Sequence, residues 1–391
     1  MNRTVCNHRI MKGLNKASIM HLLWKKGALS RVELAKKLGL AAKTVTNLTR
    51  EMLAKDLIKP AGYRSSSGGR RQELLELNPD YKYGLGIYLG GRYLEGAIVD
   101  LKGKVSIYKK IPVDIRESQS SLLNKIKQLT GEFIIQTKMS KLFGIGFVFH
   151  GILDINGETI ISSAILPNLK GVKIKNFFRE NFSIPIEVET SSRAIALAEK
   201  WFGAARNIDS FILLELGVGI GNTIMDKGEI FYGASGHAGE IGHTIVEING
   251  RMCRCGHRGC LETVASIPAI EEEMAYYFKG SRPKNFKELC QLAINGNGTA
   301  KKIIAKAGRY IGIAVSNLVN TLNPSHLIIS GELVQSKQIL FRTIDKTLKK
   351  YVLPSFYDSL QIISGKLGEQ AAVIGGATLV LKRCFETTEL N

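Results

Sequence analysis

The sequence predicts an α/β protein in two parts: a small helical domain with a β-hairpin at the N-terminus, followed by a larger region of strands and helices. Residues 1–80 carry 16 of the 54 Lys and Arg residues but 6 of the 34 Asp and Glu residues, so half of the net charge of +20 lies in about a fifth of the chain. Three helical patterns follow one another within these residues. From residue 83 onward, buried strands end in glycine turns.

End signals delimit the first two helices. The helix Lys16–Lys26 carries its apolar residues on one face and stops at Gly27. The second helix begins at Ser30 and stops at Gly39. In the segment SRVE, Ser30 stands three residues before Glu33, which is the spacing of a capping box. A third helical pattern starts directly afterwards, which is the spacing of a helix-turn-helix unit.

The third helix, Ala41–Lys55, has one apolar and one polar face. The apolar residues recur at i, i+3, i+7 and i+8: Val45, Leu48, Met52 and Leu53. The opposite face presents Lys43, Asn47 and Arg50, with Thr44 and Thr46 on its flanks. A positive, hydrogen-bonding face near a helix N-terminus suits insertion into the major groove of DNA.

A predicted hairpin completes this domain. Short strands at Leu57–Lys59 and Gln72–Leu77 flank the loop YRSSSGGRR, whose arginines Arg64, Arg70 and Arg71 can reach phosphates or the minor groove. We therefore predict a winged helix-turn-helix domain over residues 1–80 with DNA as its partner. A basic face without a partner, a three-helix protein-interaction module and a linker are the alternatives.

The second part opens on a strand at Tyr83–Leu89, a turn at Gly90–Gly91 and a returning strand at Leu94–Val99. This is the arrangement of the phosphate hairpin in actin-like ATPases. The elements expected further along are strands at Gly144–Phe149, Ile184–Val188, Phe211–Leu216 and His326–Ser330, a helix at Arg193–Phe202, and a second glycine turn at Gly217–Gly221.

The segment Gly242–Cys260, GHTIVEINGRMCRCGHRGC, has the spacing H-x9-C-x-C-x4-C. Its His243, Cys253, Cys255 and Cys260 supply one imidazole and three thiolates, which is a complete tetrahedral set for one structural zinc ion. Ordinary buried cysteines and a disulfide framework are the alternatives. A disulfide framework is disfavoured because the three other cysteines are scattered and secretory features are lacking.

The whole chain resembles the winged-helix, xylose-repressor-like branch of the ROK family (repressors, open reading frames and sugar kinases). The resemblance rests on SRVELAKKLGLAAKTVTNLTREMLAKDLIKPAG, on the SSSGGRR wing, and on the signature segments GASGHAGEIGHTIVE and CRCGHRGCLETVAS. It implies two actin-like (ribonuclease H-like) lobes around a sugar cleft. The smaller lobe covers residues 81–195 and is completed by residues 376–391. The larger lobe covers residues 196–375 and carries the zinc loop. The resemblance also implies sugar contacts from Asn168, Glu240, His243 and Glu262. The alternative for Glu240 and Glu262 is that they only orient the zinc loop.

The positions that serve catalysis in kinase members of this family are altered. Kinases have a D-x-G-G-T hairpin, an Asn-Asp pair before a helix, and two further phosphate-side loops. The residues found here at those positions are Tyr88, Arg92, Thr190, Ser191, Val218 and Glu332. Serine cannot act as a carboxylate base, and each lost base or clamp costs ~3–5 kcal/mol of transition-state stabilisation. We therefore expect no catalysis.

These features predict a sugar-responsive transcriptional repressor that binds an operator as a homodimer on an inverted repeat, because one recognition helix reads only a few base pairs. A higher homo-oligomer is the alternative assembly. An active ATP-dependent sugar kinase with a fused DNA-binding domain is the first alternative. The second alternative is a DNA-binding repressor that no longer binds a sugar and is controlled by a protein partner. No stretch approaches eighteen consecutive apolar residues and the N-terminus lacks a signal-peptide core, so we expect a cytoplasmic protein without membrane contact.

Overall fold

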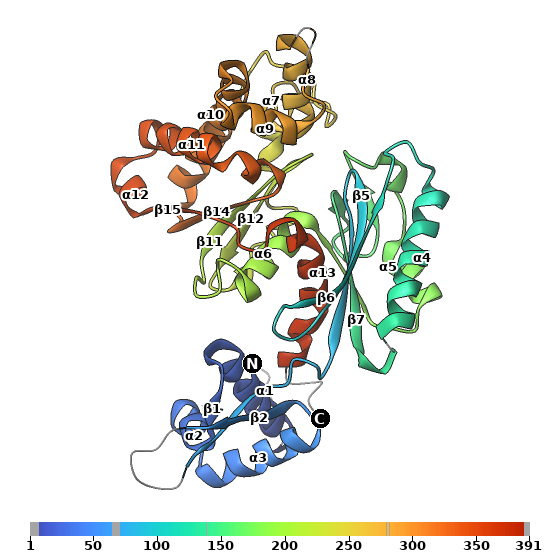
Figure 1. Cartoon of the computed structure of the whole chain (residues 1–391), viewed down its shortest axis with the longest axis vertical. Coiled ribbons are helices and arrows are strands. Elements are labelled where there is room, and N and C mark those ends of the chain that lie inside the picture. Colours follow the sequence, from blue (N-terminus) through green and yellow to red (C-terminus); the bar gives the residue numbers. More distant parts are fainter. Residues whose placement is uncertain (1–7, 65–70, 138, 279, 281, 387–391) are drawn as a thin grey trace.

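The computed structural model describes residues 8–64, 71–137, 139–278, 280 and 282–386 of the 391-residue chain. Figure 1 shows a compact N-terminal unit of helices and a hairpin, and beyond it two α/β lobes. Each lobe is built on a five-stranded sheet. This architecture confirms the predicted fold class, a winged helix-turn-helix domain followed by two actin-like lobes.

The N-terminal unit is a winged helix in which three helices accompany an antiparallel sheet of order β1-β3-β2. Its elements are α1 (His8–Lys26), β1 (Leu29–Ser30), α2 (Arg31–Leu38), α3 (Ala42–Ala54), β2 (Ile58–Tyr63) and β3 (Glu73–Leu77). The predicted capping box is confirmed, since Ser30 Oγ accepts from Glu33 N while the Glu33 carboxylate accepts from Ser30 N. Helix α1 starts earlier than the predicted Lys16, and ion pairs of Lys12 and Lys16 with Glu51 of α3, at 2.7 and 3.1 Å, hold this extension.

The first lobe contains a sheet of order β10-β7-β4-β5-β6. β4, β5 and β6 form an antiparallel meander, and β7 and β10 continue the sheet in the direction of β4. The strands are β4 (Tyr83–Leu89), β5 (Tyr93–Val99), β6 (Val105–Pro112), β7 (Leu142–Phe149) and β10 (Ile186–Thr190). Figure 1 shows α4 (Gln119–Thr137) and α5 (Ile174–Asn181) on one face of this sheet and α13 (Ala371–Leu381) on the other.

The second lobe contains a sheet of order β13-β12-β11-β14-β15. The strands are β11 (Phe211–Leu216), β12 (Ile220–Asp226), β13 (Glu229–Ile230), β14 (His326–Ser330) and β15 (Gln361–Ser364). The helices of this lobe are α7 (Glu262–Ala265), α8 (Ile267–Tyr277), α9 (Phe286–Ile294), α10 (Gly298–Leu322), α11 (Lys337–Tyr351) and α12 (Pro354–Ser359). The strands predicted at Phe211–Leu216 and His326–Ser330 are confirmed to the residue. Within the described residues, no helix is long and apolar enough to cross a membrane.

Two buried helices connect the lobes. Helix α13 lies against the backbone of the first sheet, because an ideal Cβ at Gly146 would stand only 1.8 Å from the carbonyl oxygen of Gly376. Helix α6 (Ser191–Phe202) packs along α13 and also contacts strands of both lobes. The predicted domain boundaries at 195/196 and 375/376 fall within these two helices, and they stay a prediction.

Candidate functional site

The histidine and the three cysteines predicted as metal ligands gather at one point of the second lobe. Cys253 Sγ lies 3.6 Å from His243 Nδ1, and Cys255 Sγ lies 3.6 Å from Cys260 Sγ. The four ligand atoms are all within 4.8 Å of one another, and the three thiols are free. One imidazole nitrogen and three sulfurs at this spacing fit the tetrahedral donor set of a structural metal. The cluster can therefore hold a metal ion.

The loop that carries the cysteines is shaped by its glycines and by two short bridges. Ile245 pairs with Cys260, and Met252 pairs with Arg258, so the loop folds back on itself. Gly259 has a φ of +75°, and a Cβ there would stand 1.6 Å from the carbonyl oxygen of Glu247. Only glycine fits such an approach, and Gly259 stands directly before the predicted ligand Cys260.

A cavity of about 320 Å³ adjoins this cluster and lies between the lobes. His243 connects the two, because its Nδ1 faces Cys253 while its Nε2 lies 3.9 Å from Glu240 Oε2. Glu240 and Glu262 both line the cavity, and Glu262 Oε2 accepts from the main-chain N–H of Ile220 at 3.3 Å. Burial in this recess raises the pKa of the Glu240 carboxyl, and the neighbouring His243 opposes that shift. Two carboxylates and an imidazole suit the hydroxyl groups of a sugar.

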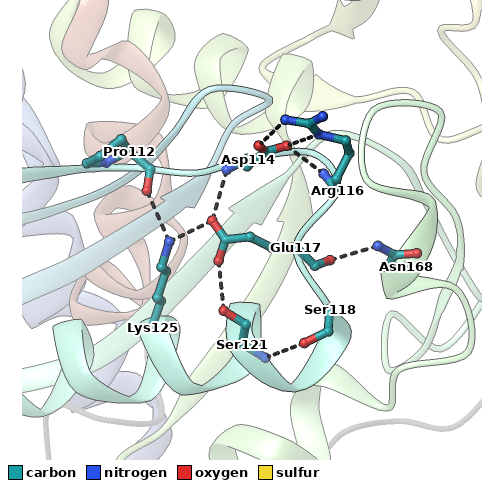
Figure 2. Close-up of polar contacts among 8 residues, drawn as sticks. All are labelled: Pro112, Asp114, Arg116, Glu117, Ser118, Ser121, Lys125 and Asn168. Atoms are coloured by element: carbon teal, nitrogen blue, oxygen red, sulfur yellow. Dashed lines mark hydrogen bonds and ion pairs between the residues drawn. The ribbon is translucent and has the colours of Figure 1, made fainter.

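Asn168 does not line this cavity in the structure, and its contact with a sugar stays a prediction. It is exposed in the 3-10 turn Pro167–Leu169, where its Nδ2 donates to the main-chain carbonyl of Glu117 at 2.7 Å. Its own carbonyl accepts from Gln119 Nε2 at 2.8 Å. Figure 2 shows that the Glu117 side chain is in turn held by Lys125, at 2.6 Å. The side chain of Asn168 thus fastens its turn to the start of α4.

A buried hydrogen-bonded chain that sequence reasoning missed closes the floor of the cavity. The Tyr88 hydroxyl lies 2.6 Å from His150 Nε2, His150 Nδ1 lies 2.8 Å from Ser191 Oγ, and Ser191 Oγ donates to Glu215 Oε2 at 2.6 Å. One tautomer satisfies every member: Tyr88 donates to Nε2, and Nδ1–H donates to Ser191. Burial holds the pKa of Tyr88 well above its usual value, so this phenol keeps its proton. The available signal was that His150 directly follows β7 and that Glu215 stands near the end of β11.

This chain separates two cavities. His150 and Glu215 line both the cavity beside the metal cluster and a second one of about 630 Å³ on its other side. The second cavity contains the turn Gly90–Gly91 together with Arg92. Val218 and Glu332, two more of the positions predicted to differ from kinase members, also line it, and burial raises the pKa of Glu332.

Arg92 crosses the opening between the lobes. Its Nη2 lies 3.0 and 3.1 Å from the two carboxylate oxygens of Glu271 on α8. The resemblance predicts a small hydroxyl side chain at this position in kinase members, whereas Arg92 is a cation that is already paired with the opposite lobe. The ion pair bridges the two lobes at the second cavity.

Five of the predicted DNA-binding residues lie on α3. Lys43, Asn47 and Arg50 are exposed on α3, and Thr44 and Thr46 are half-buried on its flanks. Of the wing residues, Arg71 is exposed, and Arg70 lies outside the described residues. Arg64 is also exposed, but its Nη2 donates to Glu33 Oε1 at 2.9 Å, so it is held against the N-terminus of α2.

Comparison with known proteins agrees with this geometry. A model of the ROK family matches residues 84–383, and a model of winged helix-turn-helix DNA-binding domains matches residues 15–59. The chain belongs to the ROK family. It is similar over nearly its whole length to regulators in that family. It is 29% identical to the DNA-binding transcriptional dual regulator NagC of Escherichia coli, over 97% of this chain and 95% of that protein.

Further relatives share both the regulator architecture and the kinase fold. The ROK protein is 27% identical to the xylose repressor of Bacillus spizizenii, over 99% of this chain and all of that protein. A crystal structure of a ROK family transcriptional regulator, homologous to the E. coli MLC protein, superposes with a TM-score of 0.81 at 28% identity and covers 97% of this chain and 98% of that chain. A ROK family glucokinase from Streptomyces griseus, 22% identical, shares the fold with a TM-score of 0.68 over 76% of this chain and 98% of its own.

Proposed function

We propose that this ROK protein is a sugar-responsive transcriptional repressor that binds operator DNA through α3 and the β2–β3 wing. The observation that carries the proposal is the combination, in one chain, of an exposed polar and basic recognition face with an interlobe cavity lined by carboxylates and an imidazole. Similarity over the full length to NagC and to a xylose repressor supports it. Location in the cytoplasm is part of the proposal.

The sugar would lie in the cavity of about 320 Å³, against Glu240, His243 and Glu262. Carboxylates accept two hydroxyl hydrogens each, and His243 Nε2 is directed at the same space. A zinc ion held by His243, Cys253, Cys255 and Cys260 would fix the tautomer and orientation of that imidazole. The donor set favours zinc because three thiolates are soft ligands.

The protein would respond to sugar without phosphorylating it. Ser191 stands where kinase members have the carboxylate base, and it already donates its hydroxyl hydrogen to Glu215 at 2.6 Å. The hydrogen-bonded chain from Tyr88 to Glu215 lies between the two cavities, where a phosphoryl group would have to pass. In-line transfer requires the two reactants in contact, so both the missing base and the side chains that lie between the cavities argue against kinase activity.

DNA binding would use two copies of the chain on an inverted repeat. A single α3 presents Lys43, Asn47 and Arg50 to only a few base pairs, which is too short a site for operator specificity. A symmetric homodimer doubles the site and explains the preference of such domains for half-sites spaced by a helical turn.

The test is a footprint on the DNA upstream of the protein's own gene, with Asn47→Ala and Asn317→Ala as a matched pair. Asn317 is also an exposed asparagine on a helix, but it lies on α10. We expect a protected inverted repeat for the parent protein and for Asn317→Ala, and a loss of protection for Asn47→Ala. Protection of a single half-site by a monomer would contradict the dimer model, and equal protection by both variants would contradict the assignment of α3.

A parallel thermal-shift screen of monosaccharides tests the sensor. Glu262→Gln removes one cavity carboxylate, whereas Glu180→Gln makes the same change on the exposed surface of α5. A sugar that raises the melting temperature of the parent and of Glu180→Gln, but much less that of Glu262→Gln, would support the cavity assignment. If no sugar raises the melting temperature of the parent protein, the result would favour a repressor without a sugar ligand.

A further inference from the structure

We propose that α6 carries the state of the sugar cavity to the DNA-binding domain, and that the contacting indole pair of Trp24 and Trp201 is the joint through which it does so. This inference rests on the proposed function. It assigns the regulation to a single helix and to two positioning residues, neither of which touches sugar or DNA.

The N-terminal end of α6 forms part of the cavity wall. Its cap Thr190 and its first residues Ser191, Ser192 and Arg193 all line the cavity. Ser191 is bound to Glu215, and Arg193 Nη2 donates to the carbonyls of the loop that leads to Glu240, at 2.7 and 3.1 Å. A ligand that engages this wall therefore acts directly on the start of the helix.

The C-terminal end of α6 meets the winged helix. The rings of Trp201 and Trp24 of α1 lie 4.7 Å apart between centroids, and Phe385 packs edge-on against Trp201 at 4.9 Å. Arg206, just beyond the helix, donates to the main-chain carbonyl of Trp24 and places its guanidinium 5.2 Å above that indole. Residues of α1 and of the first lobe accordingly share one apolar core, in which Trp24 is 9% exposed. Figure 1 shows the winged helix seated at this end of the lobes.

Between its two ends α6 is held as a stiff body. Its 12 residues span about 18 Å, and eight of them are buried. An ideal Cβ at Gly375 of α13 would stand 2.2 Å from the carbonyl of Ala194, so the two helices touch through their backbones. The fully buried carboxylate of Glu199 accepts from the N–H groups of Ala204, Lys366 and Leu367 at 2.6, 2.8 and 3.0 Å. A helix packed this tightly shifts as a unit, so a displacement at the cavity reaches Trp201 instead of being absorbed on the way.

The position of α1 in turn orients the recognition surface. Helix α3 is fixed to α1 by the ion pairs of Lys12 and Lys16 with Glu51. A second link, the ion pair of Lys102 with Glu76 at 2.7 Å, joins the β5–β6 turn to β3 of the winged helix. A shift of Trp201 against Trp24 would therefore move the whole DNA-binding domain relative to its partner copy.

The sequence supplies its own probe for this joint, because Trp24 and Trp201 are its only tryptophans. The first arm needs no ligand: tryptophan emission and operator affinity are compared for the full-length parent, Ser191→Ala and Ser162→Ala. Both serines line the cavity, but Ser162 belongs to β9 (Ile160–Ser162) and not to α6. We expect Ser191→Ala to shift the emission and to change operator affinity by more than about fivefold, and Ser162→Ala to leave both unchanged. Equal behaviour of the two variants overturns the proposal, whatever the protein does with sugars.

The second arm uses D-xylose, D-glucose and N-acetylglucosamine with Trp201→Ala and the conservative Trp201→Phe. For any of these sugars that stabilises the parent thermally, we expect Trp201→Ala to keep the thermal shift and the sugar-free operator affinity, but to lose the operator response to within about twofold. Trp201→Phe should keep that response, because it retains a ring against Trp24. A Trp201→Ala protein that responds like the parent refutes the joint. If none of the sugars stabilises the parent, the proposed sugar sensor is contradicted for these ligands, while the first arm still decides the role of α6.

Discussion

Replacing Glu199 by glutamine should destabilise the protein strongly although the change alters a single atom. The carboxylate is fully buried, with Oε2 accepting from Ala204 N and Oε1 accepting from Lys366 N and Leu367 N. Glutamine has one acceptor oxygen. If that oxygen serves Lys366 and Leu367, the new NH2 group faces the N–H of Ala204, so one hydrogen bond is lost and a buried donor is left without a partner.

The magnitude follows from these contacts. An unsatisfied buried donor costs about 1–3 kcal/mol, and the two remaining hydrogen bonds weaken when the acceptor loses its charge. We expect a loss of about 2–4 kcal/mol, or about 4–8 °C in melting temperature at about 2 °C per kcal/mol for a large domain. Thermal unfolding followed by circular dichroism measures it, with the exposed Glu180→Gln as the control. A Glu199→Gln protein that melts within about 1 °C of the parent would refute the role given to this carboxylate.

Three further predictions concern the metal, the DNA and the sugar. Elemental analysis should find about one zinc per chain. Cys255→Ser should lower both the zinc content and the melting temperature, because metal binding and folding of the loop are coupled. Parent protein that contains no zinc would contradict the metal assignment. Asn47→Ala should lower discrimination between operator and mismatched DNA by about 1–3 kcal/mol in competition gel shifts, whereas Asn317→Ala should leave it unchanged. Glu262→Gln should bind operator normally without sugar but require more sugar for release, and a response at the parent's sugar concentration would remove Glu262 from the site.

Local signals in the sequence were sufficient to predict most of the helices and strands named in the sequence analysis. The capping box at Ser30 and Glu33 and the apolar runs Tyr83–Leu89 and Phe211–Leu216 depend on neighbouring residues, and the structure has them where they were expected. The metal ligands could be predicted from the sequence for the same reason. Cys253, Cys255 and Cys260 lie within one loop, so their spacing already brings the three thiols close together.

Features that depend on contacts between distant segments were not predictable in this way. Asn168 was assigned by resemblance, but its amide is used to hold a turn against Glu117, fifty-one residues earlier in the chain. His150 and Glu215 carry no local motif, and their role appears only where β7 and β11 end at the same cavity. Sequence periodicity places a side chain on a face of its own element, whereas these contacts are set by packing between elements.

The most direct test of the central claim is the fluorescence anisotropy of labelled operator DNA bound to the protein, followed during addition of a sugar identified by thermal shift, with no nucleotide present. The account predicts that anisotropy falls as the sugar is added, and that the sugar recovered afterwards is unmodified. Release that requires ATP, or phosphorylated sugar in the recovered sample, would show that the protein transfers phosphate despite Ser191 at the position of the base, and would contradict the account.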